Sequence, residues 1–215
     1  MQNQLDKLLA KNNKIELINL LALISASAVL RKEKILKQLL INAKLRKINC
    51  VKIYEAILQT YLFAGFPIAL ISLSIFHEFF PNCKTSKTTE GMSDYYYIGE
   101  VTCRKIYGDK FEKLIENTSK FSQELADWLI IEGYGKVLSR NILSLKEREL
   151  LNISVLTSLK FENQLYSHIN GAYRLGVKIS KIKEIILMLN LLGKPTISNF
   201  GIKTLDKYLG RKRVK

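Results

Sequence analysis

Residues 164–172 read Gln-Leu-Tyr-Ser-His-Ile-Asn-Gly-Ala, and Gly176 follows four residues later. The stretch has no proline, and helices commonly stop at a glycine such as Gly176, so the pattern predicts a helix over 162–175. Gln164 precedes His168 by four residues, and the two side chains therefore share one helix face. The chain has only two histidines, which makes this helix the first place to look for chemistry.

The preceding segment predicts a second helix that carries charged residues. Ser144 is followed three residues later by Glu147, a capping-box pattern that predicts a helix over about 145–159. Arg148 and Glu149 lie on it, in the same hairpin as His168. A His and a Glu in a helical cleft can move protons near neutral pH, because the unperturbed pKa of histidine lies there.

This hairpin supplies the candidate site. Gln164 can orient the imidazole, and an arginine can hold a substrate carboxylate through a bidentate fork. A polar pair with a purely structural role is the alternative. If the chain turns near residue 160, Glu149 and His168 differ in height by several Å at about 1.5 Å per residue. The sequence therefore leaves open whether they bond directly or through a water or a substrate. The candidate catalytic residues are His168, Glu149 and Gln164, and the candidate substrate-binding residues are Arg140, Arg148 and Tyr134.

Helical periodicity recurs along most of the chain, beginning with apolar residues at three- and four-residue spacing between Leu17 and Ala28. Three prolines and few turn-rich segments favour helices over a sandwich of strands, and we predict an all-α fold. Further helices are expected at 32–47, 51–64, 67–79, 109–131 and 181–192. We expect Gly133-Tyr134-Gly135 to end the helix over 109–131, Leu114, Phe121, Leu125 and Leu129 to point inward from it, and Ser180 to cap the last helix.

The two halves of the chain resemble each other at an offset of 129 residues. Residues 41–43 correspond to 170–172, Glu55 corresponds to Glu184, and Gly65-Phe66-Pro67 corresponds to Gly193-Lys194-Pro195 after one deletion. The order of these landmarks predicts a tandem repeat. We expect a first, degenerate module over 1–80, a polar linker over 81–92, and a second module over 93–215 that holds the candidate active site and a basic tail.

Charge and hydropathy restrict the partners. The net charge is +15, but the lysines are spread along the chain and only residues 210–215 form a basic cluster, so we expect no specific nucleic-acid partner. Residues 56–76 carry no formal charge and are long enough to span a bilayer. Gly65-Phe66-Pro67 interrupts them, which indicates two core helices meeting at a corner rather than a membrane span.

The three cysteines, Cys50, Cys83 and Cys103, are far apart and lack the Cys-x-x-Cys spacing of a redox pair or a zinc knuckle. We expect reduced thiols, no metal and a cytoplasmic protein. The first residues have no cationic segment leading into an apolar stretch, so no signal peptide is expected.

The second half resembles the carboxymuconolactone decarboxylase family. The resemblance rests on residues 135–140 (Gly-Lys-Val-Leu-Ser-Arg), 143–150 (Leu-Ser-Leu-Lys-Glu-Arg-Glu-Leu) and 164–172, and on Gly176 and Glu184. The Tyr-Ala-Gly-x-Pro motif of the family is altered to Leu-Gly-Lys-Pro at 192–195, and it survives better at 63–67 as Phe-Ala-Gly-Phe-Pro. The resemblance implies the alkylhydroperoxidase D-like helical fold.

The family has two branches. Its peroxidases use Cys-x-x-Cys-x-x-x-His with a glutamate nineteen residues before the histidine. Glu149 and His168 keep this spacing, but Phe161 and Gln164 occupy the cysteine positions. Without thiolates there is no nucleophile for a peroxide, and peroxidase activity is therefore disfavoured.

The decarboxylase branch implies loss of CO₂ from a carboxylated lactone and protonation of an enolate-like intermediate, without a cofactor. By resemblance, an arginine would bind the carboxylate while His168 and Glu149 transfer the proton. In the first copy Glu16 matches Glu149, but Leu39 stands at the position of His168, so that copy is expected to be structural. A non-catalytic ligand-binding or scaffold protein is the alternative.

The resemblance also bears on assembly. Family members form rings, commonly hexamers of single modules. A chain of two modules is therefore expected to form a homotrimer with hexamer-like pseudo-symmetry.

Overall fold

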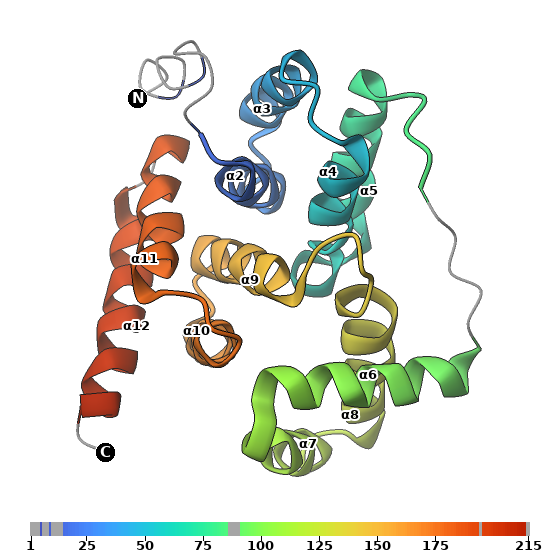
Figure 1. Cartoon of the computed structure of the whole chain (residues 1–215), viewed down its shortest axis with the longest axis vertical. Coiled ribbons are helices and arrows are strands. Elements are labelled where there is room, and N and C mark those ends of the chain that lie inside the picture. The colour runs from blue at the N-terminus through green and yellow to red at the C-terminus, as the bar shows by residue number, and fades with distance from the viewer. Residues whose placement is uncertain (1–4, 6–8, 10–14, 86–90, 194, 214–215) are drawn as a thin grey trace.

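Apolar residues at helical spacing fold into a layered array of helices, and the all-α class is confirmed (Figure 1). The computed structural model describes residues 5, 9, 15–85, 91–193 and 195–213, and no strand occurs among them. The α-helices are α2 (Leu17–Val29), α3 (Glu33–Leu45), α4 (Cys50–Leu58), α5 (Tyr61–Phe79), α6 (Met92–Tyr107), α7 (Phe111–Ser119), α8 (Gln123–Trp128), α9 (Leu145–Leu159), α10 (Glu162–Arg174), α11 (Ile179–Met188) and α12 (Pro195–Arg213). Two short 3₁₀ helices, η1 (Gly108–Lys110) and η3 (Leu189–Leu192), and one π-helix, η2 (Leu129–Leu138), complete the set.

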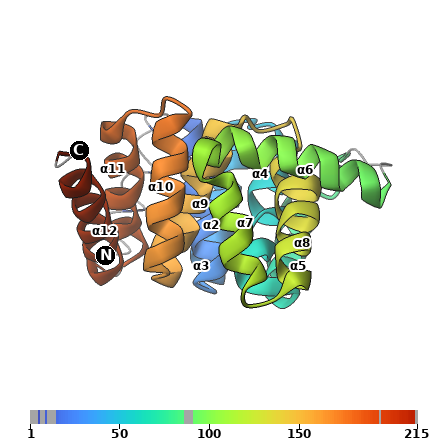
Figure 2. The same cartoon turned by 90° about the horizontal axis from the view of Figure 1, so that it is seen from below.

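Helices α2 and α9 pack against each other at the centre of the molecule, and most side chains of both are buried (Figure 1). Helices α3, α4 and α5 surround α2, while α10, α11 and α12 surround α9 (Figures 1 and 2). One continuous core contains apolar residues of both groups. The main core thus contains residues of both predicted modules. The division of the chain at residues 80 and 93 stays a prediction.

A smaller core lies between α6, α7 and η2. Two glycines allow α6 and η2 to touch through their backbones. A Cβ at Gly99 would lie 2.1 Å from the carbonyl oxygen of Ile130, and a Cβ at Gly135 would lie 2.2 Å from that of Tyr95. Any larger residue at either position would force the two helices apart.

This contact explains one wrong prediction. Gly133-Tyr134-Gly135 lies inside η2 and does not end a helix, because packing against α6 carries the helix through it. The helix expected over 109–131 is instead divided into η1, α7, α8 and the start of η2. Ser122 starts α8 by accepting a hydrogen bond from the amide of Leu125, and this new start leaves Phe121 86% exposed rather than inward.

Other helix ends follow their local signals more closely. The capping box of Ser144 and Glu147 is confirmed at the start of α9, and Gly176 follows α10 with a φ of 84°. Ser180 lies inside α11, whose N-cap is Lys178, so the predicted cap is wrong. Helix α5 starts at Tyr61, and the backbone of Gly65 (φ 75°, ψ 173°) is not helical, so two helical segments meet at the expected corner.

The two groups of helices also show the same internal arrangement. In each group the first helix packs on the other three, and the fourth packs on the second and third. Positive φ angles occur at Arg31 and Lys160 and at Lys47 and Gly176, both pairs 129 residues apart. Gly65 and Gly193 form a third such pair, one residue closer together. These matches favour the predicted duplication, which stays a prediction.

The cysteine prediction was wrong for two of the three residues. Cys50 and Cys83 form a disulfide, with their Cα atoms 6.0 Å apart, while Cys103 is free and buried. Cys50 begins α4, and the segment after α5 returns to it. Spacing along the sequence gave no sign of this pair, because the helical hairpin joins residues 33 positions apart.

Helix α5 is, by length and composition, the one helix among the described residues that could cross a membrane, and 22% of its most apolar window is buried. Its bend at Gly65 and the proline at position 67 interrupt the element. The absence of a membrane partner stays a prediction.

Candidate active site

The site is built on the hairpin of α9 and α10. Glu149 lies in the second turn of α9 and His168 near the middle of α10, and both side chains are buried. The Nδ1 atom of His168 lies 2.9 Å from Oε2 and 3.1 Å from Oε1 of Glu149. Of the two arrangements that the sequence left open, the direct hydrogen bond is the one present. The side chains cover the height difference, and the contact is direct.

The geometry indicates one tautomer of His168. A carboxylate only accepts hydrogen bonds, so Nδ1 carries the proton that is donated to Glu149. This leaves Nε2 with its lone pair free to accept a proton from a bound molecule. The carboxylate in turn stabilises the imidazolium that forms.

Asn152 and Gly171 hold the carboxylate in place. Asn152 Nδ2 donates to Glu149 Oε1 at 3.0 Å, and Gln59 Nε2 donates to Asn152 Oδ1. Gly171 leaves the space that the carboxylate fills, because a Cβ there would lie 2.7 Å from Glu149 Oε2. Gln59 comes from the end of α4, so the first half of the chain contributes to the support of the site.

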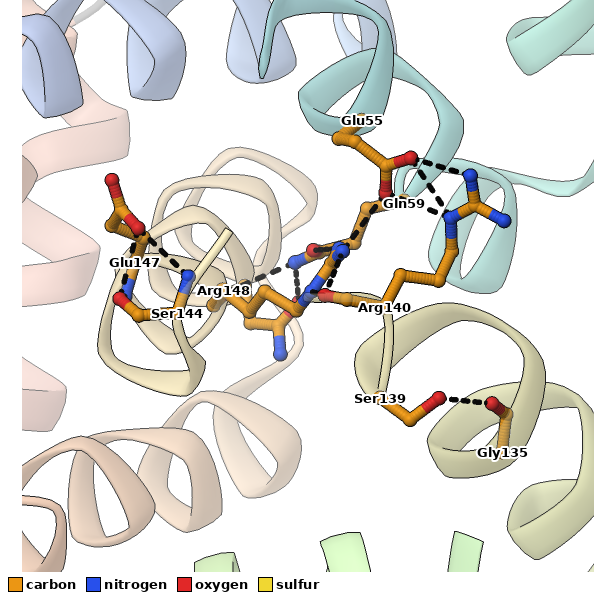
Figure 3. A network of polar contacts seen from close by, with 9 residues as sticks. Glu55, Gln59, Gly135, Ser139, Arg140, Ser144, Glu147 and Arg148 are labelled. Atoms are coloured by element: carbon orange, nitrogen blue, oxygen red, sulfur yellow. Dashed lines mark hydrogen bonds and ion pairs between the residues drawn. The ribbon is translucent and has the colours of Figure 1, made fainter. Parts of the chain in front are cut away.

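The two arginines both contact Glu55 (Figure 3). Arg148 is fully buried and donates from Nη2 to Glu55 Oε2 at 2.8 Å. It also donates to Gln59 and to the backbone carbonyl of Arg140. Arg140 donates from Nε to both oxygens of Glu55, at 2.8 and 3.0 Å. Both guanidinium groups therefore bind the same buried carboxylate, from α4, and neither borders the cavity described below.

The pKa values of the two arginines reflect their different exposure. Burial lowers the pKa of Arg148, and the contact with Glu55 offsets only part of that effect. The hydrogen bond to Glu55 raises the pKa of Arg140, whose side chain is less buried. Both groups keep their charge at neutral pH, since guanidinium pKa values start far above it.

Gln164 and Tyr134 occupy different surroundings. Gln164 is exposed and forms no hydrogen bond with His168, so its predicted role in orienting the imidazole has no contact to support it. Tyr134 is buried and lines the cavity, and its hydroxyl interacts with Tyr107. Burial raises the pKa of Tyr134 well above its usual value, so the phenol stays protonated.

A cavity of about 550 Å³ opens on His168. Its walls come from the start of α5, from α8 and from η2. Four leucines and Gly133 line it, and its ionisable or aromatic lining residues are Tyr61, Phe63, Phe66, Trp128, Glu132, Tyr134 and His168. Glu149 stays behind His168, which makes the imidazole the group that a bound molecule would meet.

Sequence reasoning missed much of this environment. It did not identify Asn152 or Gln59, and it gave no role to Glu55. A signal existed for Glu55, because it is the last charged residue before the uncharged run of 56–76. At the offset of 129 residues the dyad corresponds to Leu20 and Leu39, which are both buried in the core. Glu16, the residue expected to match Glu149, pairs with Lys181 instead.

Two comparisons with known proteins indicate the same family. The model of the carboxymuconolactone decarboxylase family matches residues 124–194. Over 96 residues the chain is 30% identical to 4-carboxymuconolactone decarboxylase of Acinetobacter baylyi (strain ATCC 33305 / BD413 / ADP1). That alignment covers 44% of this chain and 72% of the relative. The matched segment begins in α8 and includes Tyr134, Glu149, Asn152 and His168.

Proposed function

The chain belongs to the carboxymuconolactone decarboxylase family, and on this premise we propose that it is a cofactor-free enzyme that transfers a proton on a small lactone or carboxylated substrate. One observation carries the proposal. His168 borders the cavity while its Nδ1 is held by the buried carboxylate of Glu149. This is the arrangement that general acid–base catalysis needs.

The proposed chemistry uses Nε2 of His168. As a base, Nε2 removes a proton from the carbon next to a lactone carbonyl, and the electron pair of the C–H bond moves into an enolate. As an acid, the imidazolium returns a proton to that carbon. In a decarboxylation the C–C bond to the carboxylate breaks, its electron pair moves into the enolate and CO₂ leaves. The imidazolium, which has taken its proton from the solvent, then protonates the enolate carbon. Glu149 stabilises the imidazolium in each case.

The test measures proton transfer directly. In D₂O the protein should accelerate exchange of the ring C–H protons of α-angelica lactone, an uncharged unsaturated lactone, as followed by NMR. His168→Ala should lower the enzymatic exchange rate at least about 100-fold, the size of a general acid–base contribution. Glu149→Gln should lower it less, since Nε2 remains. Decarboxylation is tested in parallel with 4-carboxymuconolactone, the compound in the relative's name.

The fold of each variant is checked by circular dichroism and thermal unfolding. A folded His168→Ala protein that exchanges lactone protons at the wild-type rate would contradict the proposal.

A non-catalytic ligand-binding protein is the second candidate. The observation that favours it is the state of the two arginines, which Glu55 holds away from the cavity. This candidate predicts that lactones raise the melting temperature of the wild-type protein while exchange stays at the rate of the protein-free solution. A peroxidase is disfavoured, because Phe161 and Gln164 stand at the two cysteine positions.

We also propose a homotrimer. Large apolar side chains are exposed together near the bend of α5, among them Phe66, Leu70 and Ile71. A face of this kind is typical of a protein–protein interface.

A further inference from the structure

We infer that the cavity at His168 selects an uncharged, largely apolar ring compound and discriminates against a carboxylated one. The inference rests on the proposed site, but not on turnover. It begins from the lining of the cavity, in which none of the described residues is a lysine or an arginine. Glu132 is the one acidic residue among them.

The arginines that were expected to bind a carboxylate, and the lysine within the η2 wall, are already paired. Arg140 and Arg148 both bind Glu55, and Arg148 has no exposed surface. Lys136 binds Glu132 through its Nζ. A ligand carboxylate in the cavity would therefore lose its water without gaining a guanidinium or ammonium partner, which is unfavourable.

Two acidic groups add to this effect. Glu132 accepts a hydrogen bond from the hydroxyl of Tyr61 at 2.9 Å, and both residues line the cavity. Glu149 lies directly behind the imidazole and already balances any positive charge on it. Neither group offers a positive charge to a ligand carboxylate, because Glu132 is already paired with Lys136 and Glu149 balances the imidazolium of His168.

The net charge of the whole chain acts in the opposite direction. A charge of +15 attracts anions at long range. Charges on the surface are screened over about 8 Å at physiological ionic strength, so the groups around the cavity decide what binds inside it.

The walls suit a flat, uncharged ring. The ring centroids of Tyr61 and Phe66 lie 5.2 Å apart. The rings of Phe63 and His168 are in edge-to-face contact, with centroids 5.9 Å apart and an interplanar angle of 83°. Aromatic walls of this kind bind flat apolar molecules well. The cavity of about 550 Å³ has room for a fused two-ring lactone.

A matched pair of ligands tests the inference. Coumarin is an uncharged bicyclic lactone, and coumarin-3-carboxylate differs from it by one carboxylate. Calorimetric titration of the full chain at physiological salt should give a dissociation constant for coumarin at least tenfold lower than for the carboxylate. Equal or tighter binding of the carboxylate, or no binding of coumarin at millimolar concentration, would overturn the inference.

A charge-removing variant identifies the cause. Glu132→Gln should tighten binding of coumarin-3-carboxylate at least threefold and change coumarin binding less than twofold. Glu116→Gln is the matched control, because Glu116 is exposed on α7 and pairs with Lys120, which follows that helix. It should change neither constant. Equal effects of the two variants would mean that only the overall charge matters, contrary to the inference.

The experiment also separates this inference from the proposed function. His168→Ala should lose proton exchange while keeping the preference for coumarin. A wild-type protein that prefers coumarin but shows no exchange would contradict the proposed enzyme and leave the ligand preference in place. A wild-type protein that exchanges protons but binds the carboxylate better would contradict the ligand preference and leave the proposed enzyme in place.

Discussion

Arg148 shows how a residue can match a family motif and yet have a structural position. Its guanidinium is fully buried between Glu55, Gln59 and the backbone of Arg140. Removing one partner of a buried ion pair leaves the other charge without compensation, which commonly costs about 3–5 kcal/mol. In an Arg148 variant, Arg140 still binds Glu55 and should limit the loss of folding stability.

We therefore expect Arg148→Met to lower the free energy of unfolding by about 3 kcal/mol, measured by urea denaturation. Arg104→Met is the control, because Arg104 forms exposed ion pairs with Glu100 and Glu112, and its unfolding midpoint should stay nearly unchanged. An Arg148→Met protein that is as stable as the wild type and differs only by a raised KM would contradict this prediction and support a substrate-binding role for Arg148.

The cysteines give a second prediction at this scale. Burial is the main cause that raises the pKa of Cys103, to about 12, so the residue stays a thiol at ordinary pH. Only a thiolate reacts readily with disulfide reagents. With Cys50 and Cys83 in a disulfide, the native protein should release no chromophore from Ellman's reagent at pH 8.

The same protein should show one thiol when unfolded without reductant and three after reduction. Two or three reactive thiols in the unreduced, unfolded protein would support the reduced state that the sequence alone suggested.

The dyad could be found from sequence, but its surroundings could not. Glu149 and His168 stand out because the family spacing of nineteen residues is intact. Asn152 and Gln59 have no such marker, since polar residues are common in helices and only the packing of α4 on the site brings Gln59 near. The pairing of Glu55 with two arginines from the other half is likewise a long-range contact that local patterns do not encode.

At the scale of elements, the stabilisation that the N-terminal cap of α9 gives to the fold should depend on pH. Burial by itself raises the pKa of Glu147, but hydrogen bonds from Ser144 and Lys52 outweigh it, and the pKa lies below its usual value. A carboxyl whose pKa is lowered by folding stabilises the native state above its unfolded pKa, and that stabilisation is lost as the pH falls through the folded pKa.

Ser144→Ala should therefore destabilise the protein by about 1 kcal/mol at pH 7, and the difference from wild type should shrink below about pH 4. Chemical denaturation of both proteins at a series of pH values measures this difference in stability. A difference that stays constant down to pH 3 would show that the carboxylate of Glu147 plays no part in the cap.

Helix boundaries were predicted well where a local signal decides them and poorly where packing does. Ser144 and Gly176 act through bonds within a few residues, and both predictions are confirmed. The π-helix η2 is different, because its course through Gly133 and Gly135 depends on the close approach of α6. Periodicity along one segment contains no information about that neighbour.

The whole molecule should form the proposed homotrimer through the exposed apolar face of α5. Leu70 is 64% exposed, and a charge there would be unfavourable in an interface. Light scattering coupled to gel filtration should give the mass of three chains for the wild type and of one chain for Leu70→Glu. Leu45→Glu is the matched control, since Leu45 is equally apolar and 77% exposed on α3. A monomeric wild type would contradict the trimer.

Trp128 is the only tryptophan of the chain, and it lies in the wall of the cavity with 57% of its surface exposed. Indole emission moves to shorter wavelengths when a bound molecule displaces water from the ring. Because no second tryptophan adds background, the intrinsic fluorescence of the unmodified protein reports the filling of this one cavity. A library of small molecules can therefore be screened against the protein without a label, before any substrate is known.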